Sequence, residues 1–310
     1  MKSIKDKNLL IYGTGAVGGY YGGMLAKAGF DVTFVARGKN YEALKQNGLT
    51  LIRDGKKEII PIKVFSNTKD LGAFDYIFIC VKSFHTKDIL EKIKENIDSR
   101  TTLISLQNGI ENEEIMVERY GREKVIGAFV YIASQLINPG IVEVIGNTKG
   151  MIGELDGSIT ERIKELQSMF KSINVDFVIS KNIMGDMWDK LVWNTAFNST
   201  SVLTGKTLDQ ILGDKTLFSL VRDIMTEVKH VAIANKIKIR PDTVEFNLER
   251  SKGYTGFKTS MLQDFEAGRP LELEELVGVV IRKAKEKNIS VPNIEKVYKE
   301  VKQKTVKTKV

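Results

Sequence analysis

The sequence predicts an α/β fold in which an amino-terminal doubly wound sheet is followed by an all-α carboxy-terminal domain. Up to about residue 180, short apolar runs alternate with helical stretches, which is the pattern of a parallel sheet covered by helices on both faces. From Ile183 to about Lys302, apolar residues recur at three- and four-residue spacing, which is typical of helices. The predicted domains are therefore residues 1–180 and 181–310.

The predicted elements of the first domain follow in chain order. Strands are expected at 8–12, 31–36, 75–81, 101–106 and 124–132, with helices beginning near residues 15, 39, 86 and 112 between them. Pro139-Gly140 introduces two further runs, 141–145 and 150–153, which are expected to be separate hairpin strands. A helix near 158–171 and a strand at 175–179 complete the domain.

The first predicted strand leads directly into a glycine-rich turn that opens a helix. The residues of the turn are Gly13, Thr14, Gly15, Ala16, Val17 and Gly18. The first glycine permits the tight turn, the second lets backbone approach a pyrophosphate, and the third lets helix pack against strand. Free N–H groups at the helix start attract the anion. The turn predicts a Rossmann-type dinucleotide site, with a flexible glycine loop before an ordinary helix as the alternative.

The end of the second predicted strand indicates which dinucleotide binds. NAD sites usually carry Asp or Glu there, which binds the ribose 2′-hydroxyl. Here the strand ends in Arg37, nineteen residues after Gly18. A guanidinium binds a 2′-phosphate bidentately, whereas a carboxylate repels it. The sequence therefore favours NADP (as NADPH) over NAD, unless Arg37 is a solvated surface residue.

Composition narrows the remaining classes of protein. The only cysteine, Cys80, lies in an apolar run, and there are only two histidines, so neither a disulfide nor a metal site is expected. The stretch from Leu9 to Ala26 holds six glycines and is expected to be neither signal peptide nor membrane span, which favours the cytoplasm. Residues 281–310 hold ten Lys/Arg and three Glu, so most of the net charge of +8 belongs to the last helix and tail. No nucleic-acid partner is expected.

The second domain contains a helix with an unusual polar face. Lys190, Asn194 and Asn198 are four residues apart and therefore share one side of the helix. No charged residue occurs from Leu191 to Gly205, which indicates a buried helix whose asparagines need hydrogen-bond partners. The partners are other protein groups or a bound polar ligand. Beside a nicotinamide, a lysine could protonate the alkoxide that ketone reduction leaves.

These motifs, in this order, resemble those of the ketopantoate reductase (2-dehydropantoate 2-reductase) family over essentially the whole chain. Besides the glycine turn, Arg37 and the Lys190-x-x-x-Asn194-x-x-x-Asn198 face, the resemblance rests on four short motifs. They are Val81-Lys82, Gln107-Asn108-Gly109, Ser260-Met261-Leu262-Gln263-Asp264, and Leu271-Glu272 after Gly268-Arg269-Pro270.

The resemblance implies roles for individual residues. Gly13–Gly18, Arg37 and Lys82 correspond to NADPH-binding positions, and Asn108 to one that touches both cofactor and substrate. Lys190 corresponds to the proton donor, which also contacts the substrate. Asn194, Asn198 and Ser260 correspond to substrate-binding positions, and Glu272 to an acidic residue at the junction of cofactor and substrate. From the residues alone, Ser260 could equally be a capping hydroxyl and Glu272 the acidic start of a helix.

The function expected from these motifs is NADPH-dependent reduction of 2-dehydropantoate to pantoate, on the route to pantothenate and coenzyme A. The expected partner is thus a small 2-keto acid, with neither nucleic acid nor membrane, and the chain is a possible homodimer. Two alternatives remain. One is a reductase of another 2-keto acid, because Gly205-Lys206-Thr207-Leu208 lacks an asparagine that some family members use for substrate. The other is a non-enzymatic module that senses NADPH.

Overall fold

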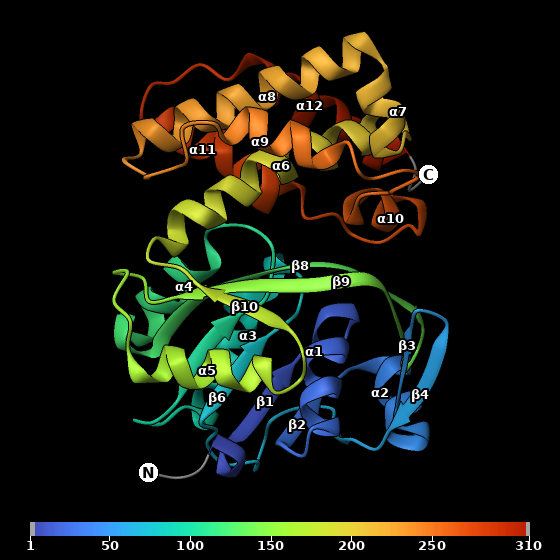
Figure 1. Cartoon of the computed structure of the whole chain (residues 1–310), viewed down its shortest axis with the longest axis vertical. Coiled ribbons are helices and arrows are strands. Elements are labelled where there is room, and N and C mark those ends of the chain that lie inside the picture. The colour runs from blue at the N-terminus through green and yellow to red at the C-terminus, as the bar shows by residue number, and fades with distance from the viewer. Residues whose placement is uncertain (1–3, 308–310) are drawn as a thin grey trace. The chain divides into compact units, whose positions relative to one another are not determined.

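The computed structural model describes residues 4–307 and divides into two compact units. Unit 1 comprises Met1–Asn108 and Asn112–Ile183, and unit 2 comprises Gly109–Glu111 and Met184–Val310. Unit 1 contains the strands and unit 2 is helical, as Figure 1 shows for each unit. The expected fold class, a Rossmann-type α/β domain followed by a helical one, is confirmed.

Unit 1 is built on one large sheet. Its strands are β1 Asn8–Tyr12, β2 Asp31–Val35, β3 Leu49–Arg53, β4 Lys56–Ile60, β5 Lys63–Phe65, β6 Tyr76–Ile79, β7 Thr102–Ser105, β8 Val125–Asn138, β9 Ile141–Gly153 and β10 Asp176–Ile179. Its helices are α1 Ala16–Lys27, α2 Gly38–Asn47, α3 Thr86–Lys92, α4 Asn112–Tyr120 and α5 Glu161–Lys171, with short 3₁₀ turns at Ile4–Asp6, Ser83–His85, Lys94–Asn96 and Arg122–Lys124.

The strand order is β4-β3-β9-β8-β7-β6-β1-β2-β5, and β10 pairs with β9. From β8 to β5 the strands are parallel, whereas β8 and β9, and also β3 and β4, pair antiparallel. The prediction of two short hairpin strands after Pro139-Gly140 is wrong. Both runs belong to the single strand β9, because β8 pairs with it along almost its whole length and a bulge after Tyr131 absorbs the irregularity.

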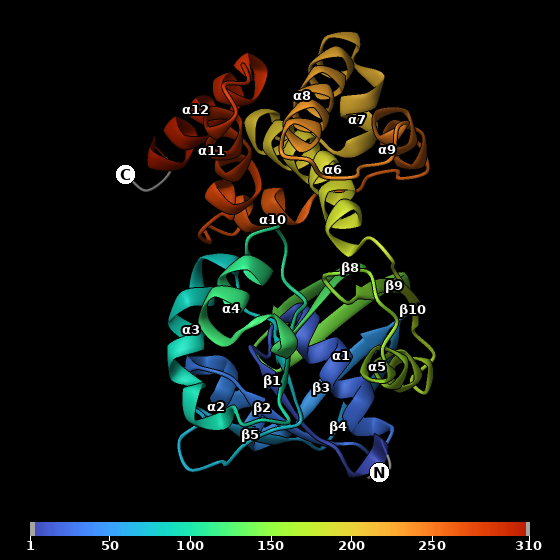
Figure 2. The ribbon, with the colours of Figure 1, turned by 90° about the vertical axis from the view of Figure 1, so that its left-hand side faces the viewer.

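The core of unit 1 lies on both faces of the sheet, because alternate residues of a strand point to opposite sides. In β1, Leu9 and Ile11 pack with α1 and α5, whereas Leu10 and Tyr12 pack with α3 and α4. Figure 2 shows α3 and α4 on one side of the sheet and α5 on the other. Helices on both faces explain why the central parallel strands are apolar throughout.

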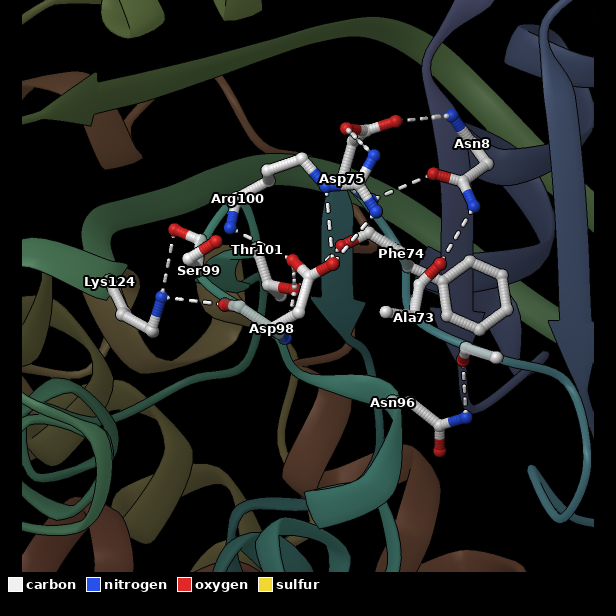
Figure 3. Close-up of polar contacts among 11 residues, drawn as sticks. Asn8, Ala73, Phe74, Asp75, Asn96, Asp98, Ser99, Arg100, Thr101 and Lys124 are labelled. Carbon is white, nitrogen blue, oxygen red and sulfur yellow. Dashed lines mark hydrogen bonds and ion pairs between the residues drawn. The ribbon is translucent and has the colours of Figure 1, made fainter.

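Polar side chains close the amino-terminal ends of the central strands. The Asp75 carboxylate accepts a hydrogen bond from the backbone N–H of Asn8 (3.1 Å), and the Asn8 side-chain oxygen accepts one from the N–H of Asp75 (2.9 Å). Thr101 donates to the carbonyl of Phe74 at 2.7 Å, and Lys124 donates to that of Asp98 at 2.7 Å (Figure 3). Internal hydrogen bonds thus occupy the amino-terminal ends of these strands. Their carboxyl ends are where ligands bind in sheets of this kind.

Unit 2 consists of helices in the part that the structure describes. They are α6 Ile183–Thr204, α7 Leu208–Gly213, α8 Lys215–Ala234, α9 Thr243–Ser251, α10 Ser260–Glu266, the π-helical segment η5 Glu274–Gly278, α11 Val279–Glu286 and α12 Pro292–Lys307. The longest, α6, is mostly buried, with Leu191, Val192 and Phe197 at most 1% exposed. Within residues 4–307, no helix is long and apolar enough to span a bilayer.

Candidate functional site

Four of the expected cofactor residues follow the carboxyl ends of four adjacent parallel strands. In sheet order these strands are β2, β1, β6 and β7, and they lead to Arg37, Gly13, Lys82 and Asn108. The order reverses between β1 and β6, since β1 is flanked by β2 on one side and β6 on the other. Such a switch point is where nucleotides bind in doubly wound sheets.

The glycine turn needs its glycines for three different reasons. Gly13 has φ +102°, a conformation that side chains disfavour. A Cβ on Gly18 would collide with the carbonyl oxygen of Gly13, so this glycine lets α1 start against the turn. A Cβ on Gly15 would meet nothing within 4 Å, so the backbone at Gly15 borders open space.

The turn has the chemistry that a pyrophosphate requires. Gly15 is the N-cap of α1, so the N–H groups of the first helical turn, beginning at Ala16 and Val17, have no partner inside the helix. The Thr14 hydroxyl donates a hydrogen bond to the carbonyl of Val35 at 3.0 Å, which holds the backbone of the turn against the end of β2. Open space in front of fixed, unpaired N–H groups fits a dinucleotide phosphate.

Arg37 is exposed at the start of α2, among several titratable side chains. Burial, followed by the positive charge of Arg37, lowers the pKa of His85 below its usual value. The charge of Arg37 also opposes the rise in the pKa of Tyr12 that burial causes. Arg37 therefore places positive charge beyond the ends of β1 and β2, where a 2′-phosphate would be expected.

Asn40 is a residue of this region that the sequence analysis missed. Its side-chain nitrogen donates to the carbonyl of Thr14 at 2.7 Å, and its oxygen accepts from the N–H of Gly140 at 2.7 Å. Asn40 thus connects the glycine turn to the turn between β8 and β9. The pattern offered no signal for it, because both partners are distant in sequence.

A buried hydrogen-bond network fixes the segment that contains Asn108. The carbonyl of Asn108 accepts from the Ser83 hydroxyl at 2.6 Å and from the Asn112 side chain at 2.8 Å. Thr86 donates to the Asn112 side-chain oxygen at 2.8 Å and accepts from the Gln107 side chain at 2.9 Å. Lys82 immediately precedes Ser83, so the network holds the backbone at two expected cofactor residues.

In unit 2 the expected polar face lies on α6. Lys190 is partly buried, whereas Asn194 and Asn198 are 6% and 1% exposed. The side-chain oxygen of Asn198 has no hydrogen-bond partner among the described residues. An unpaired buried acceptor costs about 1–3 kcal/mol, which a ligand donor could offset.

The surroundings of Lys190 make it a weaker base than an ordinary lysine. Burial, followed by the nearby charge of Arg250, lowers the pKa of Lys190 to about 8, and Glu272 opposes this. An amine with this pKa is still largely protonated near neutral pH and gives up its proton readily. Arg250, on α9, is a second residue that the sequence analysis missed.

The position of Glu272 depends on the π-helical segment that follows it. Glu272 is 5% exposed and directly precedes Leu273, where the helix begins. The Thr195 hydroxyl, next to Asn194 on α6, donates to the carbonyl of Leu276 within η5 at 2.7 Å. This hydrogen bond connects η5 to α6. Short π-helical segments within helices are frequent at functional sites. Glu272 thus lies just before the helix; it is buried, and its charge acts on Lys190.

Ser260 is the first residue of α10 and is exposed. It is not the capping residue, because the Thr259 hydroxyl accepts from the N–H of Leu262 and Thr259 is the N-cap. The Thr259 and Ser201 hydroxyls are 2.6 Å apart, and Ser201 lies on α6, one turn after Asn198. The capping alternative for Ser260 is therefore wrong, and its side chain remains available to a ligand.

Comparison with known proteins identifies the family to which the chain belongs. The family described as Ketopantoate reductase PanE/ApbA matches residues 9–157, and the one described as Ketopantoate reductase PanE/ApbA C terminal matches residues 182–305. A 2-dehydropantoate 2-reductase of Mesorhizobium japonicum is 32% identical over 294 residues, which is 88% of this chain and 90% of the relative.

Solved structures agree with this result. A 2-dehydropantoate 2-reductase from Geobacter metallireducens has a TM-score of 0.90 and 31% identity, and the match covers 96% of this chain and 99% of that one. A D-mandelate dehydrogenase solved with NADH and anilino(oxo)acetate has a TM-score of 0.91 at 21% identity, covering 98% of this chain and 100% of that one. At that identity the second match shows the fold alone.

Proposed function

Because the chain belongs to the ketopantoate reductase family, we propose that it reduces 2-dehydropantoate to pantoate with NADPH as the hydride donor. Family membership makes the chain an oxidoreductase of an NAD(P)-dependent family. The observation that supports the reaction best is Lys190, a partly buried lysine with a pKa lowered to about 8 on a polar helix face. A protein that only sensed NADPH would need no such proton donor.

The cofactor would be held by unit 1 at the carboxyl ends of its strands. Backbone N–H groups of the Gly13–Gly18 turn bind the pyrophosphate, and Arg37 binds the 2′-phosphate. Lys82 and Asn108 add polar contacts from backbone that is already fixed. When bound, NADPH supplies a hydride to the carbonyl carbon of the substrate.

Lys190 supplies the proton. As the carbonyl carbon accepts the hydride, negative charge develops on its oxygen, and the Lys190 ammonium stabilises this charge and then donates its proton to form the alcohol. Glu272 favours the protonated form of Lys190, because its carboxylate opposes the fall in the lysine pKa. The two effects together keep Lys190 charged before reaction and still make it a strong enough acid to release its proton.

The remaining polar residues would orient the substrate. In unit 2, Asn194, Asn198 and Ser260 offer amide and hydroxyl groups to a small, polar keto acid. The terminal hydroxyl of 2-dehydropantoate is a hydrogen-bond donor, and the unpaired side-chain oxygen of Asn198 is an acceptor without a partner. The proposed pairing would satisfy both groups.

The direct test is NADPH oxidation by the purified protein with 2-dehydropantoate, and separately with branched and aromatic 2-keto acids. We expect the highest kcat/KM for 2-dehydropantoate. A higher value for another keto acid would reassign the substrate. NADPH binding without reduction of any keto acid would favour the sensor.

Replacement of Lys190 tests the chemical step. Lys190→Ala should lower kcat roughly 10²–10⁴-fold, with folding and the Kd for NADPH retained. In the unaltered enzyme the reduction rate should fall as pH rises through about 8, because the acid form of Lys190 is then lost. Lys190→Arg should rescue poorly, since a guanidinium does not give up its proton. A folded Lys190→Ala protein with near-normal turnover would remove lysine from the mechanism.

A further inference from the structure

We propose that His85, in its protonated form, binds the 2′-phosphate of NADPH together with Arg37, so that the preference for NADPH over NADH increases as pH falls. The proposal rests on the proposed function, because it adds a ligand to the same cofactor site. His85 belongs to none of the motifs that predicted the site residues. The only other histidine in the chain, His230, lies on α8 in unit 2. Three features of unit 1 support the assignment.

First, the topology of the sheet brings Arg37 and His85 to the two sides of the glycine turn. The last residue of β1, Tyr12, pairs in register with the last residues of β2 and β6, so the three strands end at the same level. Arg37 follows β2 by two residues, and His85 ends the 3₁₀ turn that follows β6. A dinucleotide bound at Gly13–Gly18 therefore has Arg37 on one side and His85 on the other.

Second, hydrogen bonds and ring packing hold His85 in place. The Ser83 hydroxyl donates to the carbonyl of Asn108 at 2.6 Å, and the Thr86 hydroxyl donates to the carbonyl of Ser83 at 2.8 Å. The ring of Phe84 packs edge-on against the imidazole, with the ring centres 4.6 Å apart. The imidazole is partly exposed on this fixed turn, so little conformational freedom is lost when it binds a ligand.

Third, the charges around His85 favour an anion. The charged groups that act on it are Arg37, at the start of α2, and Asp88 and Lys92 on α3. Asp88 and Lys92 form an ion pair at 2.6 Å and change the pKa of His85 in opposite directions. Burial, followed by the charge of Arg37, lowers the pKa of His85 below its usual value. Burial raises the pKa of the neighbouring Tyr12, so this side chain stays neutral near pH 7.

A phosphate between Arg37 and His85 would reverse the effect of Arg37. Among residues 4–307, neither of these side chains has a hydrogen-bond or ion-pair partner. A phosphate monoester has a second pKa of about 6, so it carries almost two negative charges above neutral pH. An opposite charge within about 4–6 Å typically changes a pKa by about 1–3, so bound NADPH should raise the pKa of His85.

The binding of NADPH should therefore take up a proton from solvent. The added affinity is complete below the pKa of His85 in the free protein, and it is lost as pH rises through the higher pKa of the complex. NADH has no 2′-phosphate, so its affinity should not depend on His85 in this way.

The test measures the Kd of the unaltered protein for NADPH and for NADH, without keto acid, near pH 6.5 and near pH 8.5. The Kd for NADPH should be roughly threefold to tenfold lower at the lower pH, and the Kd for NADH should change little. Lys190 and Glu113 both have pKa values of about 8, but their titration should affect the two cofactors alike.

Two variants of His85 separate charge from packing. His85→Gln should match the unaltered protein near pH 8.5 and bind NADPH roughly threefold to tenfold more weakly near pH 6.5. His85→Lys, which stays charged, should bind NADPH tightly at both pH values. The exposed His230, changed to Gln, is the matched control and should keep the pH dependence.

Calorimetric titration in two buffers of different ionisation enthalpy measures the proton directly. Near pH 7.5 the phosphate of free NADPH is already doubly charged, so it contributes little. The unaltered protein should take up a fraction of a proton with NADPH and none with NADH, and His85→Gln should take up none with either.

A preference for NADPH that does not vary with pH, or that varies equally in His85→Gln, would overturn the assignment. Equal losses of NADPH and NADH binding in His85→Gln would indicate that the imidazole contacts the part that both cofactors share, and would overturn it too. If the unaltered protein bound NADPH no more tightly than NADH at either pH, the role of Arg37 in the proposed function would fall first.

Discussion

Arg37 is the residue on which the choice of cofactor depends. Its side chain is exposed and carries its charge to the end of β2, where NAD enzymes have a carboxylate. Arg37→Ala should weaken NADPH binding roughly tenfold to a hundredfold and change NADH binding little, because only NADPH has the 2′-phosphate. Fluorescence titration of both cofactors measures the difference. Equal affinity of the unaltered protein for NADPH and NADH would reject the assignment.

Asn198 should determine whether the substrate hydroxyl is recognised. Trimethylpyruvate is 2-dehydropantoate without this hydroxyl, so it leaves the Asn198 oxygen unpaired. The enzyme should therefore prefer 2-dehydropantoate, and Asn198→Ala should reduce the ratio of the two kcat/KM values by about tenfold or more. If kcat/KM fell equally for both substrates in the variant, Asn198 would have only a packing role.

Asn194→Ala should raise KM for both keto acids and leave NADPH binding unchanged.

At the residue scale, the sequence predicted those groups of site residues that are close together in the chain. The Gly13–Gly18 turn and the Lys190–Asn194–Asn198 face each lie within one element, so local geometry alone brings their members together. Asn40 bonds to Thr14 and Gly140, which are 26 and 100 residues away, and Arg250 acts on the pKa of Lys190, about 60 residues away; no local pattern predicts such contacts. The proposed roles of these residues stay predictions.

At the element scale, the parallel strands β1, β2, β6 and β7 were predicted within two residues at each end, because buried parallel strands are plain apolar runs, whereas β8 extends to Asn138 and not to residue 132. The strands β3, β4 and β5 were missed. Charged residues on the edge strand β4 hide its pattern, as is usual for edges. The Asp54-Gly55 pair, with φ of +50° and +77°, is a two-residue hairpin signal that could have revealed β3 and β4.

The helix α4 contains a buried carboxyl group that should affect stability. Glu113 is 1% exposed, so its carboxyl group is almost completely removed from water. Burial raises its pKa to about 8, although the N–H groups of Glu113 and Ala128 oppose the rise. Between the unfolded pKa near 4.5 and the folded value near 8, the folded state holds a proton that the unfolded state has lost.

The stability that this proton contributes is complete below about pH 4.5 and is lost as pH rises through about 8, with a slope of at most about 1.4 kcal/mol per pH unit. Glu113→Gln should remove this slope, so the variant should gain stability relative to the unaltered protein as pH rises. Urea unfolding at several pH values measures it. The exposed neighbour Glu114, changed to Gln, is the control. Parallel pH profiles for the unaltered protein and Glu113→Gln would contradict the argument.

At the scale of the whole molecule, the sequence predicted an α/β domain followed by a helical one, because the two halves have different hydrophobic periods. We propose that unit 1 is the NADP-binding domain and unit 2 the substrate and catalytic domain. The homodimer stays a prediction.

Hydrogen exchange with NADPH bound, in the absence of substrate, tests whether the cofactor is held by unit 1. At a hundredfold excess over Kd, binding stabilises the native state by about 2.7 kcal/mol. We expect slower exchange at the amides of Gly13–Gly18 and of Arg37–Asn40, and little change along α6. Protection of α6 as strong as that of the glycine turn would show that NADPH alone engages unit 2.

The pairing of β3 with β9 has a consequence for synthesis on the ribosome. The hairpin β3–β4 joins the sheet of unit 1 only through β9, which pairs with β3 from Thr50 to Arg53. About 90 residues separate these strands, so at 5–20 residues per second the hairpin emerges roughly 5–20 s before its partner. Throughout that interval an apolar strand edge is exposed in the nascent chain. Slower translation through residues 54–140 should therefore prolong the period in which this protein needs a chaperone.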